Sequence, residues 1–391
     1  MNKEISELRK LAKEVHMTSR ERVISTLGHK QPDIVPFSLG TTIVDGFTKF
    51  AADNFEKFLG LPPGEREITH KQMGTVVTPK AILEQYPTDF VTIRLKAPWN
   101  NPAVVYDDGS YLDDYGCLMK PCEYYYDNMN RPLEGDITVD DIKKNTWPDP
   151  YAPGRTDSLR EEALKLRETT DKALVADIMC GGPFEQSLWM RGWEDFLADL
   201  ISEPYLAEAL MDRILEVDIG LWDVFLDAVG DLVDVVCQGD DIAMQTGPIV
   251  APELFHERVF KYHKQLYDFI KSKTKAKIFH HSCGGVYKLV PDLIAAGIDI
   301  LNPIQTSAAD MDVVRLKREF GSELSFWGGL DTQKILPDGT PRQISDEVKR
   351  LVDVLGKDGG YVFAPGHNLQ ALVPPENIKA MLDTINGLRS C

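Results

Sequence analysis

The sequence predicts a (β/α)8 barrel, an α/β fold, and three observations carry this prediction. Short runs rich in β-branched and aromatic residues recur along the 391-residue chain, and most of them end in Gly, Asp, Asn or Pro. Amphipathic segments with helical spacing lie between most of these runs. Strand–helix–strand units with right-handed crossovers build a parallel sheet, and eight such strands close into a barrel. The expected strands cover residues 34–39, 90–95, 173–178, 233–238, 277–282, 298–303, 324–329 and 361–366.

The chain begins with an expected N-terminal helical extension. Residues 1–16 are charged and have a helical pattern, and Thr18 with Glu21 three residues later is a pattern typical of a capped helix start. Later helices are expected in the amphipathic segments between strands, which are residues 193–225, 252–273, 286–296, 311–320 and 341–355.

An insertion is expected after the second strand, over about residues 96–135. An Asp-Gly turn at Asp108 and Gly109 between two alternating runs predicts a β-hairpin there, at the mouth of the barrel. Residues 136–160, rich in Asp and Pro, are typical of a loop with a short helix rather than a linker between domains. We therefore expect residues 1–391 to form one domain.

Composition excludes several classes of function. No stretch approaches the roughly 18 unbroken apolar residues of a membrane span, and the N-terminus lacks the pattern of a secretory signal, so a cytoplasmic protein is expected. The formal net charge of −18 disfavours binding to nucleic acid or to anionic lipid. The six cysteines are too sparse for a disulfide framework, which favours a metal or redox role for one of them.

His281 and Cys283 are candidate metal ligands at the end of the fifth expected strand. Their H-x-C spacing points both side chains to the same side of the strand, and His and Cys bind zinc at about 2.0–2.3 Å. His280 alternates to the opposite face, so it is expected to be a packed, hydrogen-bonded residue. By itself the motif is equally compatible with a buried cysteine beside structural histidines.

His367 supplies the third candidate ligand, because it follows the eighth expected strand. Three protein ligands with an open fourth position are typical of a catalytic zinc site, whereas closed structural sites use four ligands. The sequence therefore predicts a zinc site built from His281, Cys283 and His367.

Three acidic residues are candidate catalytic groups. Asp240 and Asp241 follow the fourth expected strand, and Glu185 follows the third. Carboxyl groups at a barrel mouth can orient a ligand histidine or donate a proton to a leaving atom. The alternative for the two aspartates is a helix N-cap and a turn.

Polar and aromatic residues at the same mouth are candidates for substrate binding. Asn302 and Gln305 follow the sixth expected strand, Asp331 follows the seventh, and Tyr111 belongs to the insertion. Polar residues are common at any barrel mouth and aromatic residues often pack a hairpin, so a structural role is the alternative for each.

Six segments spread over nearly the whole chain carry a resemblance to a known family. They are residues 18–37, 239–266, 280–285, 297–305, 326–333 and 364–378. Together they resemble the uroporphyrinogen decarboxylase superfamily. The resemblance implies a TIM barrel, and the superfamily contains decarboxylases as well as zinc methyltransferases that work with corrinoid proteins.

Two departures from the family pattern select between these activities. The decarboxylases carry an Arg-rich first loop that binds the carboxylates of a tetrapyrrole, whereas residues 38–45 contain no arginine. The methyltransferases resemble this chain at His281 and Cys283 but commonly have a second Cys where His367 stands. A neutral imidazole in place of a thiolate makes zinc a stronger Lewis acid, which favours activation of a methyl donor, such as a methoxy oxygen, over activation of a thiol.

The expected function is therefore a zinc-dependent methyltransferase. It would move a methyl group from a small methylated substrate, for instance a methoxylated aromatic, to a corrinoid protein. Three alternatives stay open: transfer from a methylcorrinoid to a thiol, uroporphyrinogen decarboxylation, and a non-catalytic corrinoid-binding or regulatory barrel. The oligomeric state is also open, with a homodimer as one option.

Overall fold

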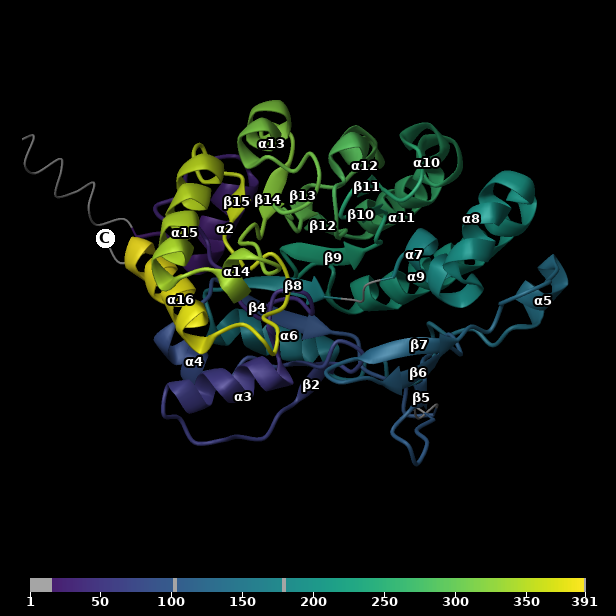
Figure 1. The fold of residues 1–391 in the computed structure, drawn as a ribbon, viewed down its shortest axis with the longest axis horizontal. Coiled ribbons are helices and arrows are strands. Elements are labelled where there is room, and N and C mark those ends of the chain that lie inside the picture. Colours follow the sequence, from purple (N-terminus) through teal and green to yellow (C-terminus); the bar gives the residue numbers. More distant parts are fainter. Residues whose placement is uncertain (1–15, 101–103, 178–180, 390–391) are drawn as a thin grey trace, which may run out of the picture.

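One curled parallel sheet forms the centre of the molecule (Figure 1). The computed structural model describes residues 16–100, 104–177 and 181–389. The predicted helix at residues 1–16, apart from its last residue, and Cys180 and Cys391 lie outside the described residues. The seven strands, in their order across the sheet, are β15 (Tyr361–Val362), β14 (Ser325–Trp327), β13 (Ile300–Asn302), β12 (Lys277–His281), β9 (Val235–Gly239), β8 (Ala173–Asp177) and β4 (Phe90–Arg94).

Residues 36–38 join the two edge strands of this sheet. Ser38 N–H donates to the carbonyl of Phe363, just after β15, at 2.9 Å, and Asp89 N–H, just before β4, donates to the carbonyl of Phe37 at 3.0 Å. The first expected strand is thus reduced to a single bridge between Phe37 and Phe363. Pro36 has no N–H to extend the ladder. The predicted barrel is confirmed, with seven regular strands and one minimal one.

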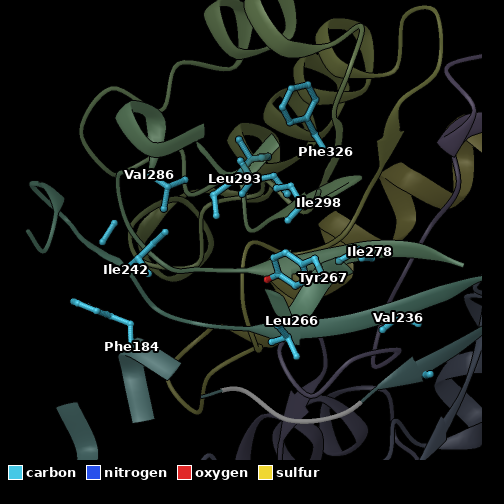
Figure 2. Close-up of a cluster of buried hydrophobic side chains, with 14 of the residues drawn as sticks. Phe184, Val236, Ile242, Leu266, Tyr267, Ile278, Val286, Leu293, Ile298 and Phe326 are labelled. Atoms are coloured by element: carbon cyan, nitrogen blue, oxygen red, sulfur yellow. The ribbon is translucent and has the colours of Figure 1, made fainter. Parts of the chain in front are cut away.

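Side chains alternate between the inside of the barrel and the surrounding helices. Phe279 and Trp327 face each other inside the barrel, with ring centroids 5.2 Å apart. The opposite faces of β9, β12 and β14 contribute Val236, Ile278 and Phe326 to the core between the sheet and the helices (Figure 2). Because the period of a strand is two residues, His281 shares the inner face with Phe279.

The helices begin and end at local signals. The capping box at Thr18 and Glu21 is confirmed at the start of α2 (Ser19–Leu27). Two of the segments in which helices were expected each contain two helices. Residues 193–225 give α8 (Trp193–Ser202) and α9 (Pro204–Val229), and residues 252–273 give α10 (Pro252–Arg258) and α11 (Phe260–Lys273). Pro204 stands at the first position of α9, where a proline ends the preceding helix but suits the start of the next.

The other helices are α3 (Lys49–Phe58), α4 (Lys80–Gln85), α5 (Val139–Lys144), α6 (Leu159–Thr169), α7 (Pro183–Arg191), α12 (Val290–Ala296), α13 (Val313–Phe320), α14 (Ile335–Asp338), α15 (Pro341–Leu355) and α16 (Pro375–Arg389). A short hairpin of β10 (Ala243–Met244) and β11 (Gly247–Pro248) follows β9. Among the described residues, no helix is long and apolar enough to cross a membrane.

The insertion forms a three-stranded antiparallel sheet rather than the expected hairpin. Its strands are β5 (Tyr111–Leu112), β6 (Leu118–Pro121) and β7 (Tyr126–Asn130). The predicted Asp-Gly turn is present, because Val105 and Tyr111 pair across it. A second small sheet, which the sequence analysis did not predict, consists of β1 (Phe47–Thr48), β3 (Thr75–Val76) and β2 (Ile68–His70). That residues 1–391 form one domain stays a prediction.

Candidate metal centre

The two histidines at the carboxyl end of β12 point to opposite faces of the sheet. His280 points towards α11, where its Nδ1 lies 2.5 Å from the hydroxyl of Tyr267, as the alternation predicts. His281 points into the barrel, and its Nδ1 lies 2.6 Å from Oδ1 of Asn302 on the neighbouring strand β13. An Nδ1–H that donates to this amide oxygen leaves Nε2 of His281 with its lone pair free.

The free nitrogen of His281 faces Cys283. Its Nε2 lies 3.5 Å from the Cys283 sulfur, and the ligand atoms of His281, Cys283 and His367 all lie within 4.8 Å of one another. Nitrogen and sulfur ligands of one tetrahedral zinc lie about 3.6 Å apart, given bond lengths of about 2.0–2.1 and 2.3 Å. The donor set and its spacing therefore fit zinc.

The turn after Cys283 requires glycine. Gly284 has a φ of +93°, and a Cβ on this residue would lie 2.6 Å from the carbonyl oxygen of Met244. Its N–H donates to Oε1 of Gln305 at 2.7 Å. The Cys283 N–H donates to Oδ1 of Asp241 at 2.7 Å. These contacts hold the Cys283 side chain beside His281.

The loop after β15 brings His367 to the same place. Asn368 anchors this loop to the first barrel loop, since its Oδ1 accepts from Gly46 N–H at 2.9 Å and its Nδ2 donates to the carbonyl of Ile43 at 2.8 Å. The rings of His367 and His281 lie 5.5 Å apart. Burial, followed by the nearby His281, lowers the pKa of His367 to about 3, so its imidazole is neutral and able to bind a metal near neutral pH.

Cys283 is held as a thiol in the absence of a cation. Burial, followed by the carboxyls of Asp241 and Glu185, raises its pKa well above the usual value. A divalent cation at this position reverses that effect, because the thiolate is the form that binds metal. Metal binding and loss of the Cys283 proton are therefore coupled.

Asp241 and Glu185 form a carboxyl pair beside the three candidate ligands. Asp241 N–H donates to Oε2 of Glu185 at 3.1 Å, and Oδ1 of Asp241 lies 3.9 Å from Nε2 of His281. Burial, followed by the charges of Asp241 and Asp240, raises the pKa of Glu185 well above its usual value. Burial and the neighbouring carboxyls therefore favour the protonated form of Glu185.

Asp240 faces away from this pair. Its carboxyl accepts from the N–H groups of Phe184 and Glu185 at 3.1 and 2.6 Å, at the start of α7, and lies 2.9 Å from Nε2 of His263 on α11. Two adjacent aspartates, both predicted to be catalytic, thus occupy opposite sides of the backbone. Asp241 lies at the candidate centre, and Asp240 holds the helix that carries Glu185.

A cavity of about 470 Å³ opens in front of the candidate ligands. Of the predicted site residues, His281, His367, Asp241, Glu185 and Tyr111 line it. Tyr115, an aromatic residue of the insertion that the sequence also offers as a wall for a ligand, lines it too. Lining residues that the sequence analysis missed include His70 at the end of β2, Lys71, Gln72 and Met73 from the turn between β2 and β3, Asp113 and Asp114 from the insertion, and Gln186 and Trp189 from α7. Trp189 is four residues after Glu185, so helical periodicity was a signal that could have found it.

The remaining predicted residues do not line this cavity. Asn302 orients His281 from inside the barrel, and Gln305 holds Gly284 N–H and donates to Gln245 at 2.8 Å. Asp331 accepts from Gln333 N–H at 2.8 Å and caps its own turn. Asn302 and Gln305 thus support the candidate ligands by hydrogen bonds outside the cavity, whereas Asp331 makes a local structural contact.

A second hollow of about 340 Å³ adjoins the carboxyl pair. It shares Gln72, Glu185, Trp189 and Asp241 with the first cavity. Seven further residues line it. They are Asp127 and Asn128 on β7, Arg131 just after β7, Leu188 on α7, Trp193 on α8, Ala243 on β10, and Ile249 just after β11. Glu185 and Asp241 therefore line both hollows.

The curled parallel sheet, with nitrogen and sulfur ligands at the carboxyl ends of its strands, defines an α/β-barrel protein with a candidate catalytic metal centre. A family model described as uroporphyrinogen decarboxylase (URO-D) matches residues 122–388, which is more than half of the sequence. The chain belongs to this family, and the predicted resemblance is confirmed.

Named relatives in this family have two different activities. A uroporphyrinogen decarboxylase from Azoarcus sp. is 22% identical over 264 residues, which cover 66% of this chain and 69% of the relative. A methylated-thiol–coenzyme M methyltransferase from Methanosarcina mazei is 25% identical over 263 residues, which cover 64% of this chain and 66% of the relative. The chain thus spans about two thirds of the length of these relatives.

A solved structure has the same fold over nearly the whole chain. It is described as a methyltransferase from Methanosarcina mazei and superposes with a TM-score of 0.64 at 18% sequence identity. The alignment covers 95% of this chain and 99% of that structure. This similarity supports the barrel architecture.

Proposed function

We propose that the protein is a zinc-dependent methyltransferase that moves a methyl group from a small methylated substrate to a corrinoid protein. One observation carries the proposal. His281, Cys283 and His367 present three nitrogen and sulfur ligand atoms within 4.8 Å of one another, and both histidines line a cavity large enough for a small molecule. Three ligands beside a cavity leave room for a substrate atom in the fourth position.

The residues around the cavity would have separate roles in methyl transfer. Zinc bound by the three ligands would supply a Lewis acid for the heteroatom of the methyl donor. Asn302 keeps Nε2 of His281 directed at Cys283. Glu185 would give its proton to the heteroatom as the bond to the methyl carbon breaks, while the electron pair of a reduced corrinoid forms the new bond to that carbon.

The two adjoining hollows would each hold one reactant of the displacement. In such a reaction the attacking atom must arrive opposite the leaving atom. The donor would occupy the cavity with Tyr111, and the corrinoid of a partner protein would approach from the hollow with Trp193. Trp189 lines both hollows and would contact both reactants.

The cavity is poorly suited to a tetrapyrrole with many carboxylates. Four carboxyl residues line it, which are Asp113, Asp114, Glu185 and Asp241, whereas Lys71 is the one Lys or Arg among its described lining residues. The first barrel loop also contains a buried acid, Asp45, whose Oδ1 accepts from Thr42 N–H at 2.8 Å. Several buried substrate charges would lack partners here, which disfavours the decarboxylase alternative.

Transfer involving sulfur is the second candidate. The relative from Methanosarcina mazei is named for methylated thiols, and a zinc site with one cysteine also binds thiolates. In that case the same cavity would hold a thioether as donor or a thiol as acceptor. A methoxy donor and a methylthio donor offered to the same protein would separate these chemistries.

The first experiment measures metal content and methyl transfer together. The purified protein, prepared without chelators, should contain about one zinc per chain, and Cys283→Ser and His367→Ala should each lose most of it. Methyl transfer from methoxy and methylthio compounds to cob(I)alamin should be followed by visible absorption. Both variants should also lose this activity.

Two substitutions away from the cavity serve as matched controls. Cys122 is an exposed cysteine in the insertion, and His256 is an exposed histidine on α10 beside Asp292. Cys122→Ser and His256→Ala should keep zinc and activity. Full zinc and full methyl transfer in His367→Ala would contradict the proposal. Decarboxylation of uroporphyrinogen by the chelated protein, without methyl transfer, would favour the decarboxylase alternative. The cytoplasmic location and the homodimer stay predictions.

A further inference from the structure

Lys71 is the one Lys or Arg among the described residues that line the candidate substrate cavity. It stands in the turn between β2 and β3. This turn is closed by Gly74 N–H, which donates to the carbonyl of Lys71 at 3.1 Å, and Gly74 has a φ of +60°. Tyr126 N–H donates to the carbonyl of Gln72 at 3.1 Å and ties the turn to the insertion. The position of Lys71 is therefore fixed by backbone contacts on both sides.

The ammonium group of Lys71 rests on aromatic rings. Its Nζ lies 3.9 Å from the ring centroid of Tyr111 and 5.6 Å from that of Tyr126. The two rings are 5.1 Å apart in an edge-on arrangement. A cation held over aromatic faces in this way keeps N–H groups available for a further partner.

No carboxylate of the described residues lies within the 4.0 Å ion-pair distance of Lys71. Three of the four carboxyls of the cavity wall accept from backbone donors instead, and the fourth, Asp114, is exposed. Asp113 accepts from the N–H groups of Tyr115 and Cys117 at 2.9 and 2.8 Å. Asp241 and Glu185 accept from Cys283 N–H and Asp241 N–H. In a chain with a formal net charge of −18, an unpaired cation inside a cavity is an exception.

We propose that Lys71, held on Tyr111, binds an anionic group of the substrate, so that the methyl donor is a small molecule with one carboxylate. This inference rests on the proposed function for the methylated end of that molecule. The carboxylate would accept charge-assisted hydrogen bonds from the Lys71 ammonium. The side chains of Met73, Tyr115 and Trp189 line the same cavity and would contact the apolar frame between the two ends.

Binding of matched acids and amides to the zinc-loaded protein tests this subsite without any need for turnover. The probes are meta-methoxybenzoate and methylthiopropanoate, each compared with its neutral amide by calorimetry. The wild type should bind at least one acid about tenfold more tightly than its amide, because a hydrogen bond to a charged group contributes about 1.5–3 kcal/mol. The two pairs distinguish an aromatic methoxy frame from an aliphatic methylthio frame.

Substitution of Lys71 should remove this preference. Lys71→Met should weaken binding of the acid about tenfold and leave binding of the amide unchanged, whereas Lys71→Arg should keep most of the preference. Lys49→Met is the matched control, since Lys49 also lies over a ring, that of Phe50, at 5.4 Å, but is paired with Asp53 and does not line the cavity. This control should bind acids and amides as the wild type does.

Two other outcomes would contradict the proposed anion subsite. Wild type that binds neither acid better than its amide, or Lys71→Met that keeps the full preference, would leave Lys71 with only a packing role. Failure of the proposed function would be seen differently. If the protein prefers the acids through Lys71 but binds no zinc and methylates no cobalamin, the anion subsite is supported and the proposed methyltransferase activity is contradicted.

Discussion

Asn302 decides which nitrogen of His281 faces the other candidate ligands. Its Oδ1 lies 2.6 Å from Nδ1 of His281, and its Nδ2 donates to the carbonyl of Trp327 at 3.2 Å, which fixes the orientation of the amide. Asn302 thereby orients one candidate metal ligand without being a candidate ligand itself. Contacts of this kind hold a ligand ring in place and favour one tautomer.

Replacing Asn302 should weaken zinc binding. Asn302→Ala removes the acceptor for Nδ1–H, and the zinc affinity should fall about 10- to 100-fold. Asn302→Asp, which keeps an acceptor oxygen, should recover much of the loss. The affinities are measured by competition with a chromophoric chelator. Asn145→Ala, at the half-buried asparagine that follows α5 and does not line the cavity, is the control. Equal zinc affinity in Asn302→Ala and the wild type would contradict this role.

Zinc binding should release a proton from Cys283. Burial and two nearby carboxyls raise the pKa of this thiol well above the usual value, so the apo protein holds the proton at neutral pH. Zinc binds the thiolate, and protons therefore compete with zinc below the thiol pKa. The apparent zinc affinity should rise about tenfold for each pH unit in this range.

Calorimetry in buffers with different ionisation enthalpies measures this proton directly. We expect about one proton released for each zinc bound. His367 should contribute none near neutral pH, because its pKa of about 3 leaves the imidazole neutral there. A zinc affinity that does not change between about pH 6 and 8 would exclude Cys283 as a thiolate ligand.

Glu185 should affect methyl transfer more than metal binding. Its pKa is raised well above the usual value by burial and then by Asp241 and Asp240, so it can donate a proton. Glu185→Gln keeps the size of the side chain but cannot donate an acidic proton. We expect the transfer rate to fall about 100-fold or more at unchanged zinc content.

The pH profile identifies the group responsible. The wild-type rate should fall at high pH as Glu185 loses its proton, and this decline should be absent from the residual activity of Glu185→Gln. Glu194→Gln, at an exposed glutamate in the first turn of α8, is the matched control. Wild-type rates in Glu185→Gln would assign proton donation to another group.

Asp240 should matter for stability. Its carboxyl accepts from two N–H groups at the start of α7 and contacts His263, and all of these groups are buried. Asp240→Ala leaves them without a partner, at about 1–3 kcal/mol for each unsatisfied group, so the free energy of unfolding should fall by about 3 kcal/mol or more. Urea unfolding measures this loss.

Asp140→Ala, at an exposed aspartate in the first turn of α5, is the control and should change the stability little. A stable, zinc-loaded Asp240→Asn that transfers no methyl group would show instead that Asp240 acts in the reaction. That result would restore the catalytic role predicted from the sequence.

Sequence periodicity was enough to place most strands of the barrel and the three candidate ligands. The strand at residues 277–282 was expected as a short β-rich run, and β12 covers Lys277–His281. Because successive side chains of a strand alternate, the separation of His280 from His281 follows from local geometry. The same logic placed His367 beside them, since parallel strands of a barrel present their carboxyl ends at one mouth.

Other features followed from contacts between distant segments. The sequence predicted the same catalytic role for Asp240 and Asp241. In the structure Asp240 packs against α7 and α11, whereas Asp241 contacts Cys283. The insertion gained a third strand, β7, through pairing with β6. The amphipathic segment over residues 193–225 forms two helices, because Pro204 starts a new one.

The sequence by itself determined the barrel and the candidate zinc ligands, because these depend on local periodicity and on residue types at strand ends. The family followed from the resemblance of six segments to known members. Only the tertiary structure decided what else faces the cavity. Lys71 lies in a turn without periodicity, and it reaches the cavity because Tyr126, 55 positions later in the chain, holds the neighbouring Gln72 by a backbone hydrogen bond. Contacts of such long range depend on the whole fold, and no local pattern encodes them.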